Sequence, residues 1–197
     1  MVRKSASGGR VKPILVKEKV VKASSEWKDP ERIVSGRKVF RSASLAGSRK
    51  RAFGDVVTFV TAADPIERVG LERLGVPAVL VREMADEMKI SAVRLYDILG
   101  VPKATATRRA AAGQRIGGAG GHAAVAMLRL IGEVHAMVAE STSAEVGKFD
   151  AAEWLGQWIE RPQPALAGQK PADLLDTPTG VEVVSRSLGS ILSGAYQ

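Results

Sequence analysis

The chain of 197 residues has no cysteine, and aromatic residues make up only 5% of it. Without cysteine it has no disulfide framework, no thiolate metal site and no cysteine nucleophile. No run approaches the roughly 18 consecutive apolar residues of a membrane-spanning helix, and no apolar stretch follows the N-terminal basic residues as in a secretory signal. We therefore expect a cytoplasmic protein with no membrane segment, large enough to bury one real core or two small ones.

Acidic residues are scarce in the first part of the chain. Residues 1–51 hold 15 Lys/Arg against 4 Asp/Glu, a local charge of +11, whereas residues 52–197 carry −3 of the total of +8. Such an arm is typical of a segment attracted to a polyanion, because cations near phosphates release counterions. The alternatives are a solvated extension that keeps the protein soluble, or a start codon placed too early. The composition predicts a basic, largely disordered arm over residues 1–60.

Helical periodicity begins at Asp64. That residue has the side chain of an N-cap and precedes a proline, Ser91 is placed as a second N-cap, and Gly100 as a helix stop. Apolar spacings of three and four residues predict an all-α fold, with helices over residues 65–74, 76–88 and 92–99 and a long linking helix from about residue 122 to 144.

Residues 95–109 have the pattern of a helix-turn-helix. A short helix is followed by a turn containing Gly100 and the apolar Val101, and then by a second helix that starts with small and basic side chains. The candidate donors to phosphates and base edges are Lys103, Thr105, Thr107, Arg108 and Arg109. The alternative is a plain helical hairpin with an arginine pair on its solvated face.

The last 48 residues carry the most specific pattern. It consists of Trp154-Leu155, a Pro164-Ala-Leu-Ala-Gly168 segment followed by Pro171, a Leu174-Leu175 pair with Thr177 and Gly180, and an apolar helix that ends in Gly194 and Tyr196. Core packing alone accounts for the apolar positions but not for the spaced prolines and glycines. The pattern resembles the toxin-binding domain of antitoxins named after Xre, MbcA and ParS, and the helix-turn-helix resembles the Xre-type module that precedes that domain.

Two segments depart from the family pattern. The stretch from Gln157 to Arg161 is longer than in the family. The small residues Gly117 to Gly121 stand where the family has a polar helix start. We therefore expect the linking helix to begin only near His122 and to fray at its N-terminus.

The resemblance implies a division into the arm (1–60), an Xre-like helix-turn-helix domain (61–146) and a toxin-binding domain (147–197). It implies a RES-domain toxin, which consumes NAD, as the partner, operator DNA bound for autoregulation, and a homodimer. It also implies that the C-terminal domain covers the active site of the toxin. The residues expected to bind toxin are Trp154, Leu166, Pro171, Leu175, Leu188, Tyr196 and Gln197.

Catalysis and metal binding find little support in the sequence. His122 and His135 lie 13 residues apart without a carboxylate at metal-ligand spacing. We expect the negative charge of Asp173 to stabilise the end of a short helix through the helix dipole. We expect no cofactor, no small-molecule substrate and no enzymatic activity. Two alternatives stay open: a helix-turn-helix transcriptional regulator without a toxin partner, and a protein that blocks a toxin but never binds DNA.

Overall fold

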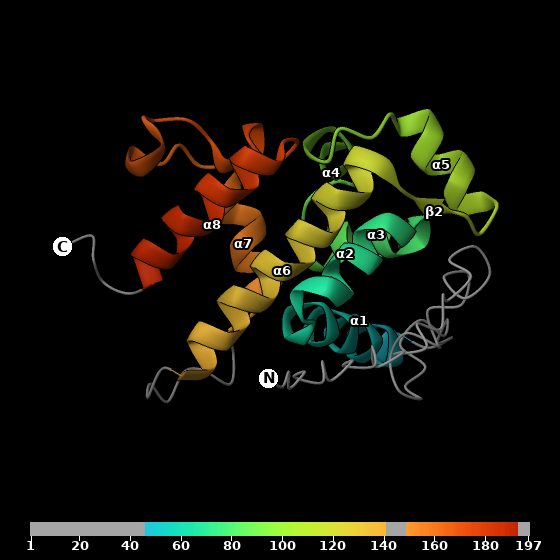
Figure 1. Ribbon diagram of the computed structural model, residues 1–197, viewed down its shortest axis with the longest axis horizontal. Helices are drawn as coiled ribbons and strands as arrows, with labels where there is room; N and C mark the ends of the chain where they lie inside the picture. The colour runs from blue at the N-terminus through green and yellow to red at the C-terminus, as the bar shows by residue number, and fades with distance from the viewer. Residues whose placement is uncertain (1–45, 141–148, 193–197) are drawn as a thin grey trace, which may run out of the picture.

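The computed structural model describes residues 46–140 and 149–192, and these residues form an all-α fold with one short β ladder (Figure 1). The α-helices are α1 (Ala46–Ala62), α2 (Pro65–Leu74), α3 (Ala78–Glu87), α4 (Ala92–Ile98), α5 (Lys103–Ala111), α6 (Gly118–Glu140), α7 (Ala151–Ile159) and α8 (Pro178–Leu192). Two single-turn 3-10 helices are η4 (Pro164–Leu166) and η5 (Pro171–Asp173), and the strands are β1 (Val76–Pro77) and β2 (Arg115–Ile116).

Helix α6 is the central element. It packs against α1 and α2, which belong to the part of the chain before α6, and against α7 and α8, which belong to the shorter part after it. We call these two parts the N-terminal and the C-terminal half. Figure 1 shows it running obliquely between these two groups of helices. Its buried side chains include Met127, Leu130 and Val134, and they belong to the same apolar core as Leu155 and Leu188 of the C-terminal helices. The two halves therefore share one core instead of folding around separate ones.

The helix starts follow from the expected caps. The Asp64 side chain accepts hydrogen bonds from the backbone N–H groups of Ile66 and Glu67, at 2.7 and 2.9 Å. The Glu67 side chain accepts one in return from the Asp64 N–H at 3.0 Å, which completes a capping box. Ser91 Oγ accepts from the Arg94 N–H at 3.1 Å. Both predicted N-caps are confirmed.

The expected end of the arm at residue 60 is wrong. That position lies inside α1, where Phe53, Val56 and Val60 are buried in the core. Composition hid this helix because its apolar residues follow directly on the basic run. What the sequence predicts for residues 1–45 lies outside the described residues.

The expected late start of the linking helix is also wrong. Helix α6 begins at Gly118, within the glycine run. A Cβ on Gly121 would lie 2.7 Å from the carbonyl oxygen of Ile116, and one on Gly120 would collide with the side chain of Val101. The glycines thus let the first turn of α6 lie against β2 and the turn after α4.

A local correction concerns residues 76–88, which the apolar spacing assigns to one helix. Val76 and Pro77 instead pair antiparallel with Ile116 and Arg115, and the helix starts at Ala78. A two-residue ladder gives no periodic signal, and the partner strand lies far along the chain. The ladder ties the segment after α5 to the start of α3.

By length and composition alone, the segment Gly118–Ala139 of α6 is apolar enough to cross a membrane. Half of its most apolar window is buried inside the protein, against the surrounding helices. Core helices also pass a test of length and composition, so this segment is weak evidence for a membrane span.

The close approach of α7 to the end of α3 gives a stability prediction. A Cβ on Gly156 would collide with the backbone carbonyl of Met88, so we expect Gly156→Ala to lower the free energy of unfolding by about 1–3 kcal/mol. The matched control is Gly54→Ala in α1, where a Cβ meets nothing within 4 Å. The control should leave stability unchanged or raise it by up to about 1 kcal/mol in urea unfolding. Equal stabilities for the two variants would contradict the packing.

Candidate functional site

The segment predicted as a helix-turn-helix consists of α4, a turn from Leu99 to Pro102, and α5. Gly100 adopts a φ of 63°, which reverses the chain, and Val101 is buried at the angle between the helices. Both features match the sequence prediction. Helix α5 carries only one buried residue, Ala106, so most of its surface faces solvent.

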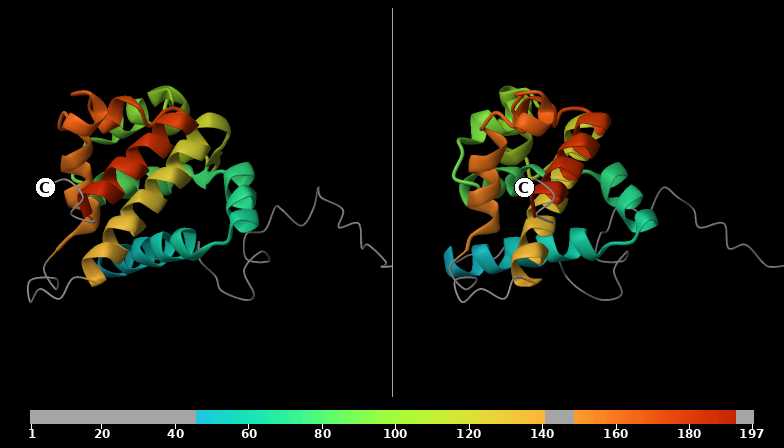
Figure 2. Two further views of the ribbon diagram at one scale, coloured as in Figure 1. Left: turned by 60° about the vertical axis from the view of Figure 1, so that its left-hand side comes forward. Right: turned by 90° about the vertical axis from the view of Figure 1, so that its left-hand side faces the viewer.

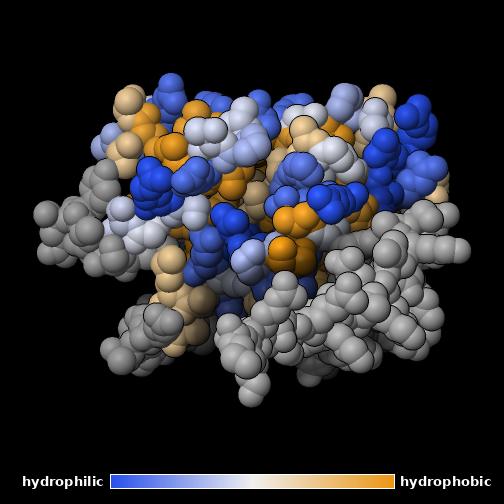
Figure 3. Space-filling view, viewed as in Figure 1, coloured by the Kyte–Doolittle hydropathy of each residue, from blue (hydrophilic) through white to orange (hydrophobic). Residues whose placement is uncertain are grey.

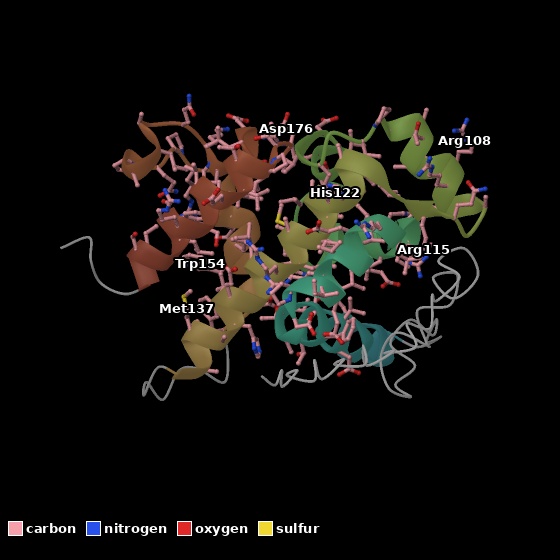
Figure 4. The ribbon with its side chains drawn as sticks, in the orientation of Figure 1. Arg108, Arg115, His122, Met137, Trp154 and Asp176 are labelled. Carbon is pink, nitrogen blue, oxygen red and sulfur yellow. The ribbon has the colours of Figure 1, made fainter. Side chains whose placement is uncertain are left out.

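The five candidate DNA-binding residues are not equally available. Lys103, Thr107 and Arg108 are exposed, and Arg108 lies on the outer side of α5 (Figure 4). Thr105 is half-buried. Arg109 donates a hydrogen bond to the carbonyl oxygen of Arg115 at 2.8 Å, so it also holds β2 in place.

Arg115 next to this helix has a structural role as well. Its guanidinium donates to the carbonyl oxygen of Gly75 at 2.8 Å, and burial lowers its pKa. The two arginines therefore join α5, β2 and the loop before β1. Arg109 and Arg115 both donate hydrogen bonds to backbone carbonyls. Lys103 and Arg108 therefore supply most of the exposed positive charge of α5.

The C-terminal half begins with an aromatic cluster. Asp150 caps α7 by accepting from the N–H groups of Ala152 and Glu153, at 3.1 Å each. The rings of Trp154 and Trp158, one turn apart, stack with centroids 6.0 Å apart and planes 9° apart. Phe149 packs on Trp154 with a centroid distance of 6.2 Å. Trp158 is buried, Trp154 is half-buried and Phe149 is exposed, so the cluster runs from the core to the surface.

Most of the residues expected to bind toxin are core residues. Leu166, Pro171, Leu175 and Leu188 are all buried, and Leu188 is fully so. These four side chains hold η4, η5 and α8 in place, and a partner would meet the surface that they support. Trp154 is half-buried, while Tyr196 and Gln197 lie outside the described residues.

An ion-pair network joins α4 to the C-terminal half. Arg94 of α4 makes two bonds to the Glu160 carboxylate at the end of α7, Nε to Oε1 at 2.6 Å and Nη2 to Oε2 at 3.2 Å. Oδ1 of Asp173 in η5 lies 3.6 Å from Nη2 of Arg94, and Nζ of Lys170 lies 3.6 Å from Oε2 of Glu160. The hydrogen bond between Arg94 and Glu160 raises the pKa of Arg94 and lowers that of Glu160, and burial partly opposes both shifts.

Sequence reasoning missed this network, because Arg94 and Glu160 are 66 positions apart and neither belongs to a motif. Its geometry is a bidentate arginine–carboxylate pair, which is the directional form of an ion pair. The network fixes the orientation of α4 relative to α7 and η5.

A groove lies between α2, α6 and α8, and we call it the α2–α6–α8 groove. It encloses about 560 Å³ and is lined by Arg68 and Glu72 of α2, by the first half of α6, and by residues 175–186 at the start of α8. Figure 2 shows α2 standing out from the helical body on the same side as α8. His122 and Asp176 line one end of it (Figure 4). Sequence reasoning gave no sign of this groove.

The C-terminal half matches a family model described as the antitoxin Xre/MbcA/ParS C-terminal toxin-binding domain, over residues 148–194. This match covers the C-terminal segment alone.

A relative carries the comparison into the preceding half. The protein named Prs ADP-ribosylating antitoxin, from Sphingobium sp. (strain YBL2), is 37% identical over 134 residues, which cover 68% of this chain and 83% of the relative. The chain belongs to the Xre/MbcA/ParS family of antitoxins. No solved structure matches it.

The Arg94–Glu160 pair gives a pH-dependent prediction. Because the pKa of Glu160 is lowered in the folded state, its stabilising contribution is full above the ordinary value of 4.5 and fades as the pH falls through the lowered pKa. Glu160→Gln should therefore cost about 1 kcal/mol near pH 7 and nothing at strongly acid pH in urea unfolding.

Glu182→Gln is the matched control for this measurement. Glu182 pairs with Arg186 at 3.2 Å on the surface, where both side chains are more than 70% exposed. This variant should change stability by less than about 0.5 kcal/mol. A cost for Glu160→Gln that does not vary with pH would contradict the ion-pair account.

Proposed function

We propose that this antitoxin neutralises a RES-domain toxin that consumes NAD, by covering the active site of the toxin with its C-terminal domain. The observation that carries the proposal is the match of residues 148–194 to a toxin-binding domain. The name of the Sphingobium relative adds support, since ADP-ribosylation draws its ADP-ribose from NAD.

The proposed mechanism is steric and not enzymatic. The buried residues Leu166, Leu175 and Leu188 fix η4, η5 and α8, and the exposed faces of these elements meet the toxin. Trp154 and the exposed Phe149 supply an aromatic anchor of the kind that dominates many interfaces. Tyr196 and Gln197 complete the set of residues proposed to bind the toxin.

We further propose that the protein binds its own operator as a homodimer and represses it. The exposed Lys103, Thr107 and Arg108 of α5 would contact the major groove, with Thr105 and Arg109 at its margin. A dimer would present two such helices to symmetric half-sites. The basic residues 1–51 would add phosphate contacts that do not depend on sequence. With a toxin and operator DNA as partners, we expect the protein to act in the cytoplasm.

Neutralisation is tested by co-expressing the chain with the RES-type protein encoded by the adjacent reading frame. We expect the toxin alone to stop growth and deplete NAD, and co-expression to restore both. Deleting everything after residue 145 is a poor test of the C-terminal domain, because the loss of α7 and α8 would expose the core side of α6. The sharper variant is Trp154→Ala, which we expect to weaken rescue while the protein stays folded.

Failure of the chain to bind or neutralise that protein would contradict the proposed antitoxin mechanism. Operator binding without any toxin partner would favour the alternative, a transcriptional regulator.

Operator binding is tested with Lys103→Ala and Arg108→Ala at fixed salt. Each variant should weaken binding, and the loss of a phosphate contact should lower the salt slope by about one unit. The control is Arg161→Ala, an exposed arginine of the C-terminal half, which should bind like the wild type. Wild-type affinity and salt slope in both α5 variants would contradict the DNA-binding role of α5.

A further inference from the structure

The α2–α6–α8 groove is built from both halves of the protein. Its α8 wall and the residues from Leu175 onward belong to the segment matched as toxin-binding, residues 148–194. Its other wall, α2, and its floor, α6, precede that segment. Any partner that reaches the α8 wall from this side therefore also meets α2 and α6.

The floor of the groove, on α6, includes three alanines, besides His122, Val125 and Arg129. Ala119, Ala123 and Ala126 follow one another along α6 at spacings of four and three residues, and Leu175 and Val181 adjoin them. Alanines at this spacing share one face of a helix and leave space above it. A volume of about 560 Å³ is enough for a large apolar side chain together with a polar neighbour.

Arg68 on the α2 wall has an unsatisfied donor. Its Nε is buried, and within the described residues it has no hydrogen-bond partner. The other two arginines of the groove differ from it, since Arg129 bonds Glu133 at 3.1 Å and Arg186 bonds Glu182 at 3.2 Å. The enclosed Nε is out of reach of a partner, so a carboxylate from outside would bind the terminal nitrogens of this guanidinium, whose planar geometry it matches. The groove thus presents small apolar side chains beside Arg68, with the carboxylates of Glu72 and Asp176 also in its lining.

The face around the groove suits a protein partner. Viewed as in Figure 1, the space-filling surface shows hydrophilic side chains across the middle of this face, with a small apolar patch over α2 beside them (Figure 3). On α2, Ile66 is 77% exposed and Val69 is 40% exposed. An apolar patch beside a polar rim is typical of a binding surface.

We propose that the α2–α6–α8 groove is a second docking site for the toxin, which places a large apolar side chain on the alanine floor and a neighbouring Asp or Glu carboxylate on Arg68. This inference rests on the proposed neutralisation of a toxin and extends the contact beyond the C-terminal domain. It assigns Arg68 and Ala126, in the half of the chain that carries the helix-turn-helix, to the toxin interface.

The test measures the Kd of the complex between the full-length antitoxin and the RES-type protein of the adjacent reading frame. Arg68→Glu places a negative charge opposite the expected carboxylate, and Ala126→Phe fills the floor. We expect each variant to weaken binding about tenfold or more, as loss of an anchor does. The control Arg82→Glu makes the same charge change at an exposed position of α3, outside the groove, and should bind within about twofold of the wild type.

Circular dichroism and thermal unfolding show whether each variant is folded. If Ala126→Phe does not fold, Arg68→Glu decides, because Arg68 lies at the margin of the core. Wild-type affinity in a folded Arg68→Glu variant would overturn the inference and leave the proposed neutralisation standing. A change in the oligomeric state of the antitoxin alone, with unchanged toxin affinity, would also overturn it and assign the groove to a second copy. A wild-type protein that binds no toxin would refute the proposed function itself.

Discussion

The structure depends on the burial of α6 on several sides at once. Ala124, Met127, Leu128, Leu130 and Val134 are all buried, and helices from both halves of the chain pack on them. Burial of this kind contributes about 25 cal/mol per Å² of apolar surface. Removing either group of helices would expose one face of α6 to water and lose that stabilisation. The helix that the sequence marks as a linker is thus the element around which the rest is assembled.

This shared core has a consequence for function. The exposed surface of α5 and the faces of α7 and α8 are parts of one body, and the Arg94–Glu160 pair fixes their relative orientation at a second point. The surfaces proposed to bind DNA and toxin are therefore held at a fixed geometry. The α2–α6–α8 groove exists only because of this arrangement, since no single half supplies all of its walls.

Local chemistry made a good part of the fold predictable. The side chains of Asp64 and Ser91 satisfy the first N–H groups of their helices, so the caps were visible in the sequence. The spacing of Trp154 and Trp158, four residues apart, likewise places both rings on one face of a helix, and in the structure they stack. What stayed hidden depends on contacts between distant segments: the burial of Phe53 in α1 and the packing that the Gly120-Gly121 pair permits.

The candidate site was less predictable than the fold, for the same reason. The family pattern marks residues such as Leu175 and Leu188 because they shape the domain, and the structure buries both. Arg109 matches a helix-turn-helix position but bonds a backbone carbonyl. Arg68 belongs to no motif, and only the fold brings it to the groove. A sequence pattern therefore identified the domain, whereas the exposed residues that could contact a partner were found only from the structure.

The central claim is that the two halves of the protein form one cooperative unit around α6. Native-state hydrogen exchange, resolved by peptide, tests it most directly. The account predicts that the most protected amides of α3 and α4 and those of α7 and α8 exchange with the same opening free energy, equal to the global free energy of unfolding. A lower opening free energy for α7 and α8, reached while α1–α6 stay protected, would contradict the account and show that the toxin-binding half unfolds on its own.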